Sequence, residues 1–143
     1  MNRYTIGDLQ VGQTESFSVT VTPSMVDAFS ELSGDINPLH MNEDFAKKRG
    51  FPGRVVFGML AASFFSTLAG VYLPGENCLL HGMNIKFKKP VFIGDTLTVS
   101  GTISELSEGL SRITVKADIT NQHGKKVTSG IIEAGVISPV QAQ

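Results

Sequence analysis

Two side chains that can transfer protons lie five residues apart in one short segment, the carboxylate of Asp35 and the imidazole of His40. Pro38 stands between them and disfavours helical geometry at Asn37, so this segment cannot continue a helix that precedes it. Loops held between rigid elements often carry catalytic groups. If the turn brings both side chains to one water molecule, they can act as base and acid, which is typically worth about 10²- to 10⁴-fold in rate.

The same residues also have an ordinary structural explanation. Asp, Asn and Pro are common turn formers, so Asp35 can cap the turn and His40 can be a packed histidine without any function. Taken alone, the spacing of Asp35 and His40 favours this structural explanation. Only further motifs elsewhere in the sequence can favour a catalytic role instead.

Two short helices are expected on either side of this loop. Thr22 and Pro23 are typical of a helix start, and Gly34 is typical of its end. Asn42 is the expected cap of the second helix, which Gly50 ends. The residues between the two helices therefore form a loop whose ends are fixed.

A stretch without any charge, residues 55–73, predicts a third helix that begins near Gly58 and ends near Gly70. At ~1.5 Å per residue this helix is roughly 20 Å long, too short for the ~30 Å hydrocarbon core of a membrane. Its apolar side chains point in several directions, so it must be enclosed by protein. They are Met59, Leu60, Phe64, Phe65 and Leu68.

Strands that could enclose this helix follow it. Apolar and polar residues alternate with the period of half-buried strands over residues 95–103 and 113–119, and further strands are expected at about 79–92 and 126–137. A similar alternation at residues 17–21 predicts one strand before the helices. The second half reads as a meander, and the whole chain, residues 1–143, as one α+β domain with a curved antiparallel sheet around a helix.

Composition narrows the choice of function. A chain of 143 residues can bury roughly 70% of the surface that it exposes when unfolded, so it needs neither a disulfide nor a structural metal. The single Cys78 and the absence of a signal-peptide pattern at the N-terminus favour the cytoplasm. Lys and Arg number 12 against 13 Asp and Glu, which argues against nucleic-acid binding.

Three motifs follow one another in the chain: L-S-G-D-I-N-P-L-H at residues 32–40, F-G-M-L at 57–60 and F-K-K-P-V-F-I-G-D at 87–95. In this order, over about residues 17–136, the sequence resembles the MaoC-like (R)-specific enoyl-CoA hydratases. The resemblance implies the hot dog fold, a long helix wrapped by a curved antiparallel sheet, which agrees with the periodicity. It also implies addition of water to a trans-2-enoyl thioester to give the (R)-3-hydroxyacyl thioester, or the reverse dehydration.

The resemblance also implies roles for individual residues. Asp35 and His40 would be the catalytic pair and Asn37 would hold their loop. We provisionally make Asp35 the base that takes a proton from water and His40 the donor to C2, and the reverse assignment stays open. The backbone N–H of Gly58 would stabilise the enolate charge on the thioester oxygen. Ser66 would position the substrate, although a serine in a buried helix can simply bond back to the preceding turn.

One residue departs from the pattern, because Phe57 stands where many relatives have a histidine. Any hydrogen bond from that histidine is missing, which affects substrate preference more than the reaction. A small basic cluster, Lys86, Lys88 and Lys89, can meet the phosphates of coenzyme A or of a carrier-protein arm, or it can be a solvated strand face.

Two other functions remain open at this stage. One is a hot dog enzyme of another kind, a thioesterase or a carrier-protein dehydratase, and the other is a noncatalytic acyl-binding subunit. Whichever of these functions the protein has, a single curved sheet leaves its edge strands unpaired. This predicts a homodimer in which the second subunit bounds part of the acyl tunnel. The proposed hydration requires no cofactor and no metal, because the acid–base pair and a backbone amide suffice.

Overall fold

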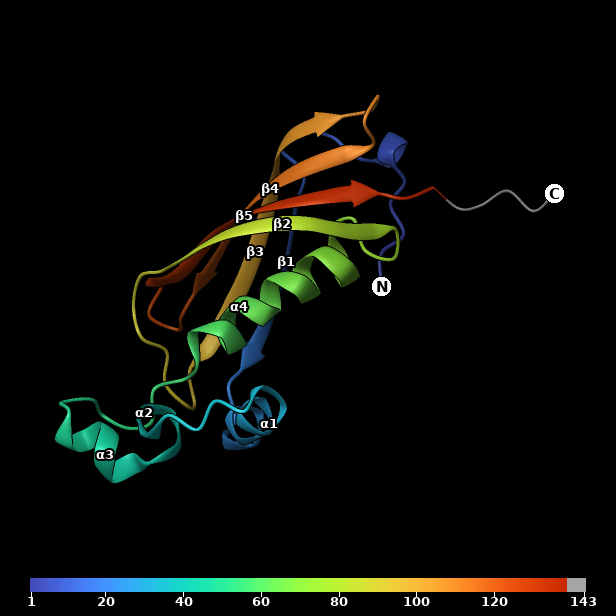
Figure 1. Ribbon diagram of the computed structural model, residues 1–143. Coiled ribbons are helices and arrows are strands. Elements are labelled where there is room, and N and C mark those ends of the chain that lie inside the picture. Colours follow the sequence, from blue (N-terminus) through green and yellow to red (C-terminus); the bar gives the residue numbers. More distant parts are fainter. Residues whose placement is uncertain (139–143) are drawn as a thin grey trace.

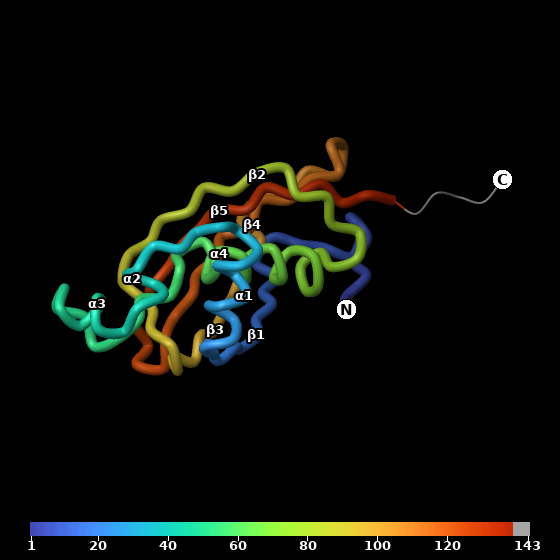
Figure 2. The backbone as a smooth tube through the Cα atoms, turned by 60° about the horizontal axis from the view of Figure 1, so that its bottom comes forward, coloured from blue at the N-terminus to red at the C-terminus, as the bar shows by residue number. Residues whose placement is uncertain are grey.

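The computed structural model, which describes residues 1–138, contains a five-stranded antiparallel sheet in the order β1-β3-β4-β5-β2. The sheet curves around helix α4, as the chain trace shows (Figure 2). This confirms the expected α+β arrangement for the described residues, while residues 139–143 of the expected domain lie outside them. The strands are β1 (Thr14–Thr20), β2 (Cys78–Phe87), β3 (Thr96–Ser107), β4 (Arg112–Thr120) and β5 (Lys126–Val136).

Alternation predicted the faces of the strands correctly but not the order of all of them. Along β3 and β4 every second side chain is buried against α4, as expected. The strands β3, β4 and β5 form a meander, but β2 pairs with β5 at the far edge and not with β3. The expectation of a meander through the whole second half was therefore wrong, because alternation fixes which face is buried and does not fix which strands are neighbours.

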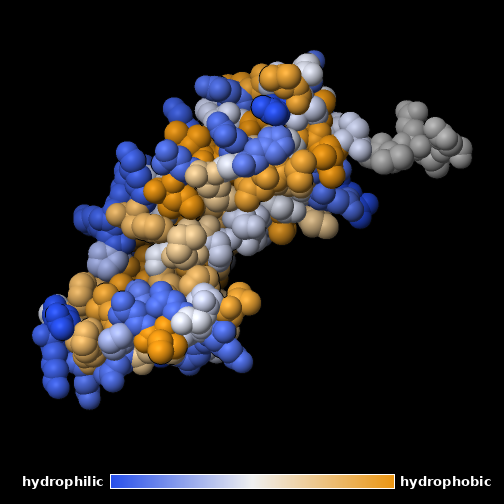
Figure 3. All heavy atoms as spheres, in the orientation of Figure 1, coloured by the Kyte–Doolittle hydropathy of each residue, from blue (hydrophilic) through white to orange (hydrophobic). Residues whose placement is uncertain are grey.

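Helix α4 (Gly58–Thr67) packs into the concave face of the sheet and continues as a π-helical segment, η2 (Leu68–Tyr72). The sheet approaches it closely, because a Cβ atom at Gly130 would lie 2.9 Å from the Phe65 ring. The helix is not enclosed on every side, however: Met59 is 59% exposed, and Ser63 and Ser66 are exposed too. In the space-filling view the surface over α4 is mostly white to orange, with few strongly hydrophilic side chains (Figure 3).

The remaining helices lie together at one end of the sheet (Figure 1). The Thr22 Oγ1 accepts a hydrogen bond from the Met25 N–H (3.3 Å), and the Asn42 Oδ1 accepts one from the Phe45 N–H (2.9 Å), so both predicted caps are confirmed. Gly34 ends the first helix with a φ of 77°, in the left-handed region that favours glycine. These helices are α1 (Pro23–Ser33), α2 (Pro38–Met41) and α3 (Glu43–Lys48), and a 3-10 turn, η1 (Ile6–Asp8), precedes β1. No helix in the described range has the length and hydropathy to cross a bilayer.

Candidate active site

The segment between α1 and α2 is shaped by two side-chain caps in succession. The Asp35 Oδ1 accepts a hydrogen bond from the Asn37 N–H (3.0 Å), and the Asn37 Oδ1 accepts one from the Leu39 N–H (2.9 Å). The second bond starts α2, in which Pro38 takes the first position, where its missing N–H has no cost. The irregular loop, expected over residues 34–40, therefore ends three residues earlier, at Asn37, and His40 lies on a helical turn.

Asp35 is fixed through its backbone by the end of α1. The buried Ser30 hydroxyl donates to the Asp35 carbonyl (2.7 Å), and the Asp35 N–H donates to the Ser33 Oγ (3.2 Å). The side chain itself is exposed, and its Oδ2 has no hydrogen-bond partner in the described part of the chain. Asp35 thus caps the turn, as a purely structural role would require, and its second carboxylate oxygen remains free.

His40 is held from both sides of its ring. Its Nδ1–H donates to the Val55 carbonyl (2.6 Å), and its ring centroid lies 4.1 Å from that of the buried Phe57. A carbonyl can only accept, so the neutral imidazole carries its proton on Nδ1 and a lone pair on Nε2. Between residues 1 and 138, no direct hydrogen bond or ion pair joins His40 to Asp35, so the structure does not bring the two predicted side chains into contact.

Arg54, which the sequence reasoning missed, ties this segment to α1. Its Nε donates to the His40 carbonyl (2.6 Å), its Nη2 forms an ion pair with Asp27 (2.6 Å), and its side chain is only 16% exposed. The one sequence feature that could have drawn attention to Arg54 is its position as a cation immediately before the uncharged stretch, residues 55–73. The backbone N–H of Arg54 donates to the Glu43 carboxylate on α3. The pKa of the Glu43 carboxyl is lowered, first by the hydrogen bond from Lys47 and then by this bond from Arg54.

A cavity of about 340 Å³ lies between His40 and the start of α4. Gly58, the first residue of that helix, lines it, and a Cβ atom there would come within 3.1 Å of the Phe87 ring. In the described structure the N–H groups of Gly58 and Met59 have no protein acceptor. The Val55 carbonyl, the usual i−4 acceptor for Met59, binds His40 instead. The cavity therefore places an imidazole beside free amides at the positive end of a helix.

The other predicted site residues lie in different places. Ser66 is exposed on the open face of α4 and does not line this cavity. The backward hydrogen bond considered for Ser66 is formed instead by Ser63, which donates to the Leu60 carbonyl (2.6 Å). Lys88 and Lys89 line the cavity, as does the buried Thr128, which the sequence reasoning did not single out.

Comparison with known proteins identifies the family. The model of the MaoC like domain matches residues 8–128 of the chain. The chain belongs to the MaoC-like family. It is 38% identical over 134 residues to an (R)-specific enoyl-CoA hydratase of Rhodospirillum rubrum, a match that covers 94% of this chain and 91% of the relative. It is also 38% identical over 122 residues to an (R)-specific enoyl-CoA hydratase of Aeromonas caviae, covering 85% and 91%.

Solved structures of the family agree with the fold described above. The structure of the (R)-hydratase from A. caviae involved in PHA biosynthesis matches with a TM-score of 0.87 and 36% sequence identity over 90% of this chain and 98% of that one. The hot dog fold expected from the sequence is thereby confirmed for this member of the MaoC-like family.

Proposed function

We propose that the protein is an (R)-specific enoyl-CoA hydratase, a hydro-lyase that adds water to a trans-2-enoyl thioester or runs the reverse dehydration. The observation that carries the proposal is the cavity in which His40, with its Nε2 free, lies beside the free backbone N–H of Gly58. A hydratase needs both a group that moves a proton and a donor for the enolate oxygen, and this cavity supplies them. The family membership supports the same reaction.

The hydrogen bond at Nδ1 supports the proton steps that we propose. In the neutral imidazole only Nε2 can accept, so His40 takes a proton from the attacking water while the water oxygen bonds to C3. The developing enolate charge lies on the thioester oxygen, next to the N–H of Gly58. His40 then returns the proton to C2. In this proposal Asp35, which does not itself line the cavity, would accept the second hydrogen of the water through its free Oδ2 and orient the molecule, which reverses our provisional roles for the pair.

The supporting residues follow from the same arrangement. Asn37 keeps its proposed role, since its side chain starts the helical turn that carries His40. Ser66 retains a substrate-positioning role in a homodimer, in which a second copy would cover the open face of α4 and complete the acyl tunnel. The unpaired edge of β2, where Leu79 is 52% and Leu80 43% exposed, supports such pairing. We further propose that the enzyme acts in the cytoplasm and needs no cofactor beyond the coenzyme A of its substrate.

The reaction can be tested directly with purified protein and crotonyl-CoA. The enoyl thioester absorbance should fall, and chiral chromatography should show the (R)-3-hydroxy product. Asp35→Asn and His40→Gln should each lower the rate by about 10²- to 10⁴-fold, because each removes a proton-handling group. The matched control is Asp44→Asn, which neutralises an exposed carboxylate on α3 and should leave the rate unchanged. Full activity of a folded Asp35→Asn variant would remove this mechanism.

The same assay separates the other hot dog activities. A thioesterase would release free coenzyme A, which a thiol reagent detects, and a carrier-protein dehydratase would prefer carrier-bound substrate over crotonyl-CoA. The protein's own thiol interferes little, because burial raises the pKa of Cys78 and leaves less reactive thiolate at a given pH. A protein that binds the thioester and turns over none of it would be an acyl-binding subunit.

A further inference from the structure

The outer face of the sheet, opposite α4, carries a concentration of positive charge at one end. A depression of about 330 Å³ there is lined by four lysines, and we name it the lysine trough. The chain as a whole has a formal net charge of −1, so this local excess is not a property of the general surface. The lysines are Lys86 and Lys88 from β2 and the residue after it, Lys116 from β4 and Lys126 from β5.

Strand register explains why these side chains meet. Residues two apart on a strand point to the same face, so Lys86 and Lys88 lie on one side of the sheet. Lys86 pairs with Ser129, and Ser129 pairs in turn with Asp118, which forms one row across three strands. The next row contains Asn84, Ile131 and Lys116. The lysines therefore surround a floor that is partly apolar, since Ile131 is 45% exposed.

Most of the charge in the lysine trough is not neutralised. Asp118 forms an ion pair with Lys126 (3.0 Å). For the other three lysines, no carboxylate lies within ion-pair distance anywhere in residues 1–138. A depression lined by unpaired lysines attracts a polyanion, and an exposed aliphatic side chain such as Ile131 can pack against an aromatic ring.

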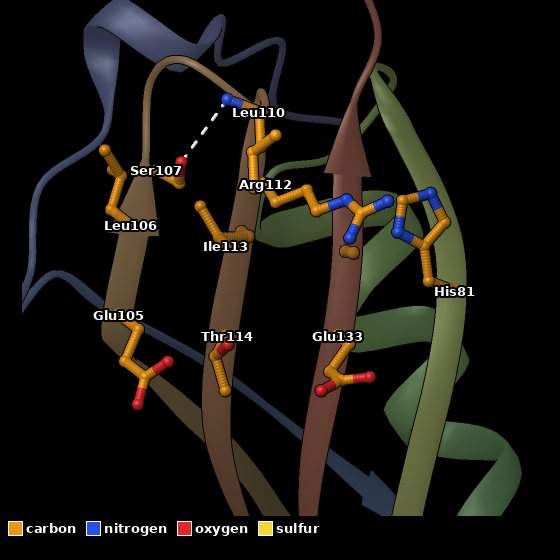
Figure 4. A pocket seen from close by; sticks show the side chains of 10 residues that line it. His81, Glu105, Leu106, Ser107, Leu110, Arg112, Ile113, Thr114 and Glu133 are labelled. Carbon is orange, nitrogen blue, oxygen red and sulfur yellow. Dashed lines mark hydrogen bonds between the residues drawn. The ribbon is translucent and has the colours of Figure 1, made fainter.

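The opposite end of the same face has a different character. There a second depression is lined by Arg112 together with two carboxylates, Glu105 and Glu133, and by His81 (Figure 4). Its single arginine is outnumbered by carboxylates, so it does not provide the same attraction for an anion. The positive charge is thus confined to the end of the sheet near the catalytic cavity.

The lysine trough and that cavity share one lining residue, Lys88. Lys88 lines both depressions, because β2 ends at Phe87 and the chain there turns from the outer face toward the cavity beside Gly58. The N–H groups of Lys88 and Lys89 both donate to the Val127 carbonyl (2.8 and 3.2 Å), which fixes this rim to β5. A ligand that extends from the catalytic cavity past Lys88 would meet the lysine trough at its rim.

We infer that the lysine trough binds the phosphorylated adenosine end of the coenzyme A thioester while the acyl group lies in the cavity beside His40. This inference rests on the proposed function. Coenzyme A combines several phosphate charges with one flat base, which matches lysines around an exposed isoleucine. Pairing of a second copy at the β2 edge leaves the trough open, because added strands extend a sheet in its own plane.

The inference is tested with Lys86→Gln, Lys116→Gln and the double variant. Lys88 is left unchanged because it also lines the catalytic cavity. The KM for crotonyl-CoA should rise about twofold to fivefold in each single variant and about tenfold in the double variant, as expected for partly exposed charge pairs. The kcat, and the KM for crotonyl-pantetheine, which lacks the nucleotide, should stay at the wild-type values. The matched control is Arg112→Gln, which removes one cation at the other end of β4 and should change none of these.

Calorimetry with coenzyme A and with pantetheine provides a readout without turnover. The wild type should bind coenzyme A more tightly, and the double variant should lose this preference. Unchanged KM and unchanged binding in the double variant would overturn the inference. An equal rise in the KM for crotonyl-pantetheine would overturn it too. A rise in KM seen only with a carrier-bound substrate would also overturn it and would indicate a protein-docking surface. If the wild type hydrates neither thioester, the proposed function fails, and the calorimetric result still decides whether the trough binds coenzyme A.

Discussion

Arg54 holds the proposed catalytic segment by two tertiary contacts. It binds the His40 carbonyl and Asp27 at once, so it fixes α2 against α1. Arg54→Gln should therefore lower kcat by about 10- to 100-fold with a smaller change in KM, because a displaced imidazole misses its near-attack position. Steady-state kinetics with crotonyl-CoA over a range of pH would measure both values.

Two further variants distinguish positioning from general stability. Arg54→Lys should recover only part of the rate, because one ammonium group cannot reproduce the two directed bonds of a guanidinium. Arg49→Gln removes an exposed cation at the end of α3 and should leave kcat unchanged. Wild-type kcat and an unshifted pH profile in a folded Arg54→Gln protein would show that the residue has no positioning role.

At this scale the sequence predicted what is local and missed what is tertiary. The caps made by Asp35 and Asn37 join residues two apart, so turn chemistry alone anticipates them. The partner of the His40 ring is a carbonyl fifteen residues away, and the partner of Arg54 is a carboxylate twenty-seven residues away. Nothing in the spacing of one sequence marks such distant pairs.

Among the elements, the close approach of the sheet to α4 depends on small residues. Gly130→Ala would place a methyl group 2.9 Å from the Phe65 ring and 3.3 Å from the Asn84 carbonyl. Overpacking of this kind typically costs about 1–3 kcal/mol in the free energy of unfolding, which urea denaturation would measure. The matched control is Gly109→Ala in the turn between β3 and β4, where a Cβ atom meets nothing within 4 Å, and it should change stability by less than about 0.5 kcal/mol. Equal stability of the two variants would contradict this account of the packing.

The elements themselves were largely predictable, because their signals lie within them. Thr22, Gly34 and Asn42 marked helix ends that the structure confirms, and alternation marked β1, β3 and β4. Which strands are neighbours was less predictable, because the pattern within a strand does not identify its partner, and β2 pairs with β5 at the edge of the sheet. The short helix α2 was missed because a single turn that starts with proline also looks like an ordinary bend.

For the whole molecule, the open face of α4 and the free edge of β2 predict a homodimer. Sedimentation equilibrium at micromolar concentration should give twice the chain mass of 15.3 kDa. Leu80→Lys, which places a charge on the β2 edge, should shift the mass toward one chain, whereas Leu110→Lys in the turn between β3 and β4 should not. A wild-type mass of one chain would contradict the dimer and with it the proposed place of Ser66.

The bonds that hold His40 and Asp35 all join residues between 27 and 55, and none of them involves the exposed side of α4. Substitutions at Met59, Ser63 and Ser66 should therefore alter the shape of the proposed acyl-binding surface without disturbing the proposed proton-transfer groups. A combinatorial library at these three positions, screened with enoyl thioesters of increasing length, is the natural starting point for redirecting this protein to new substrates.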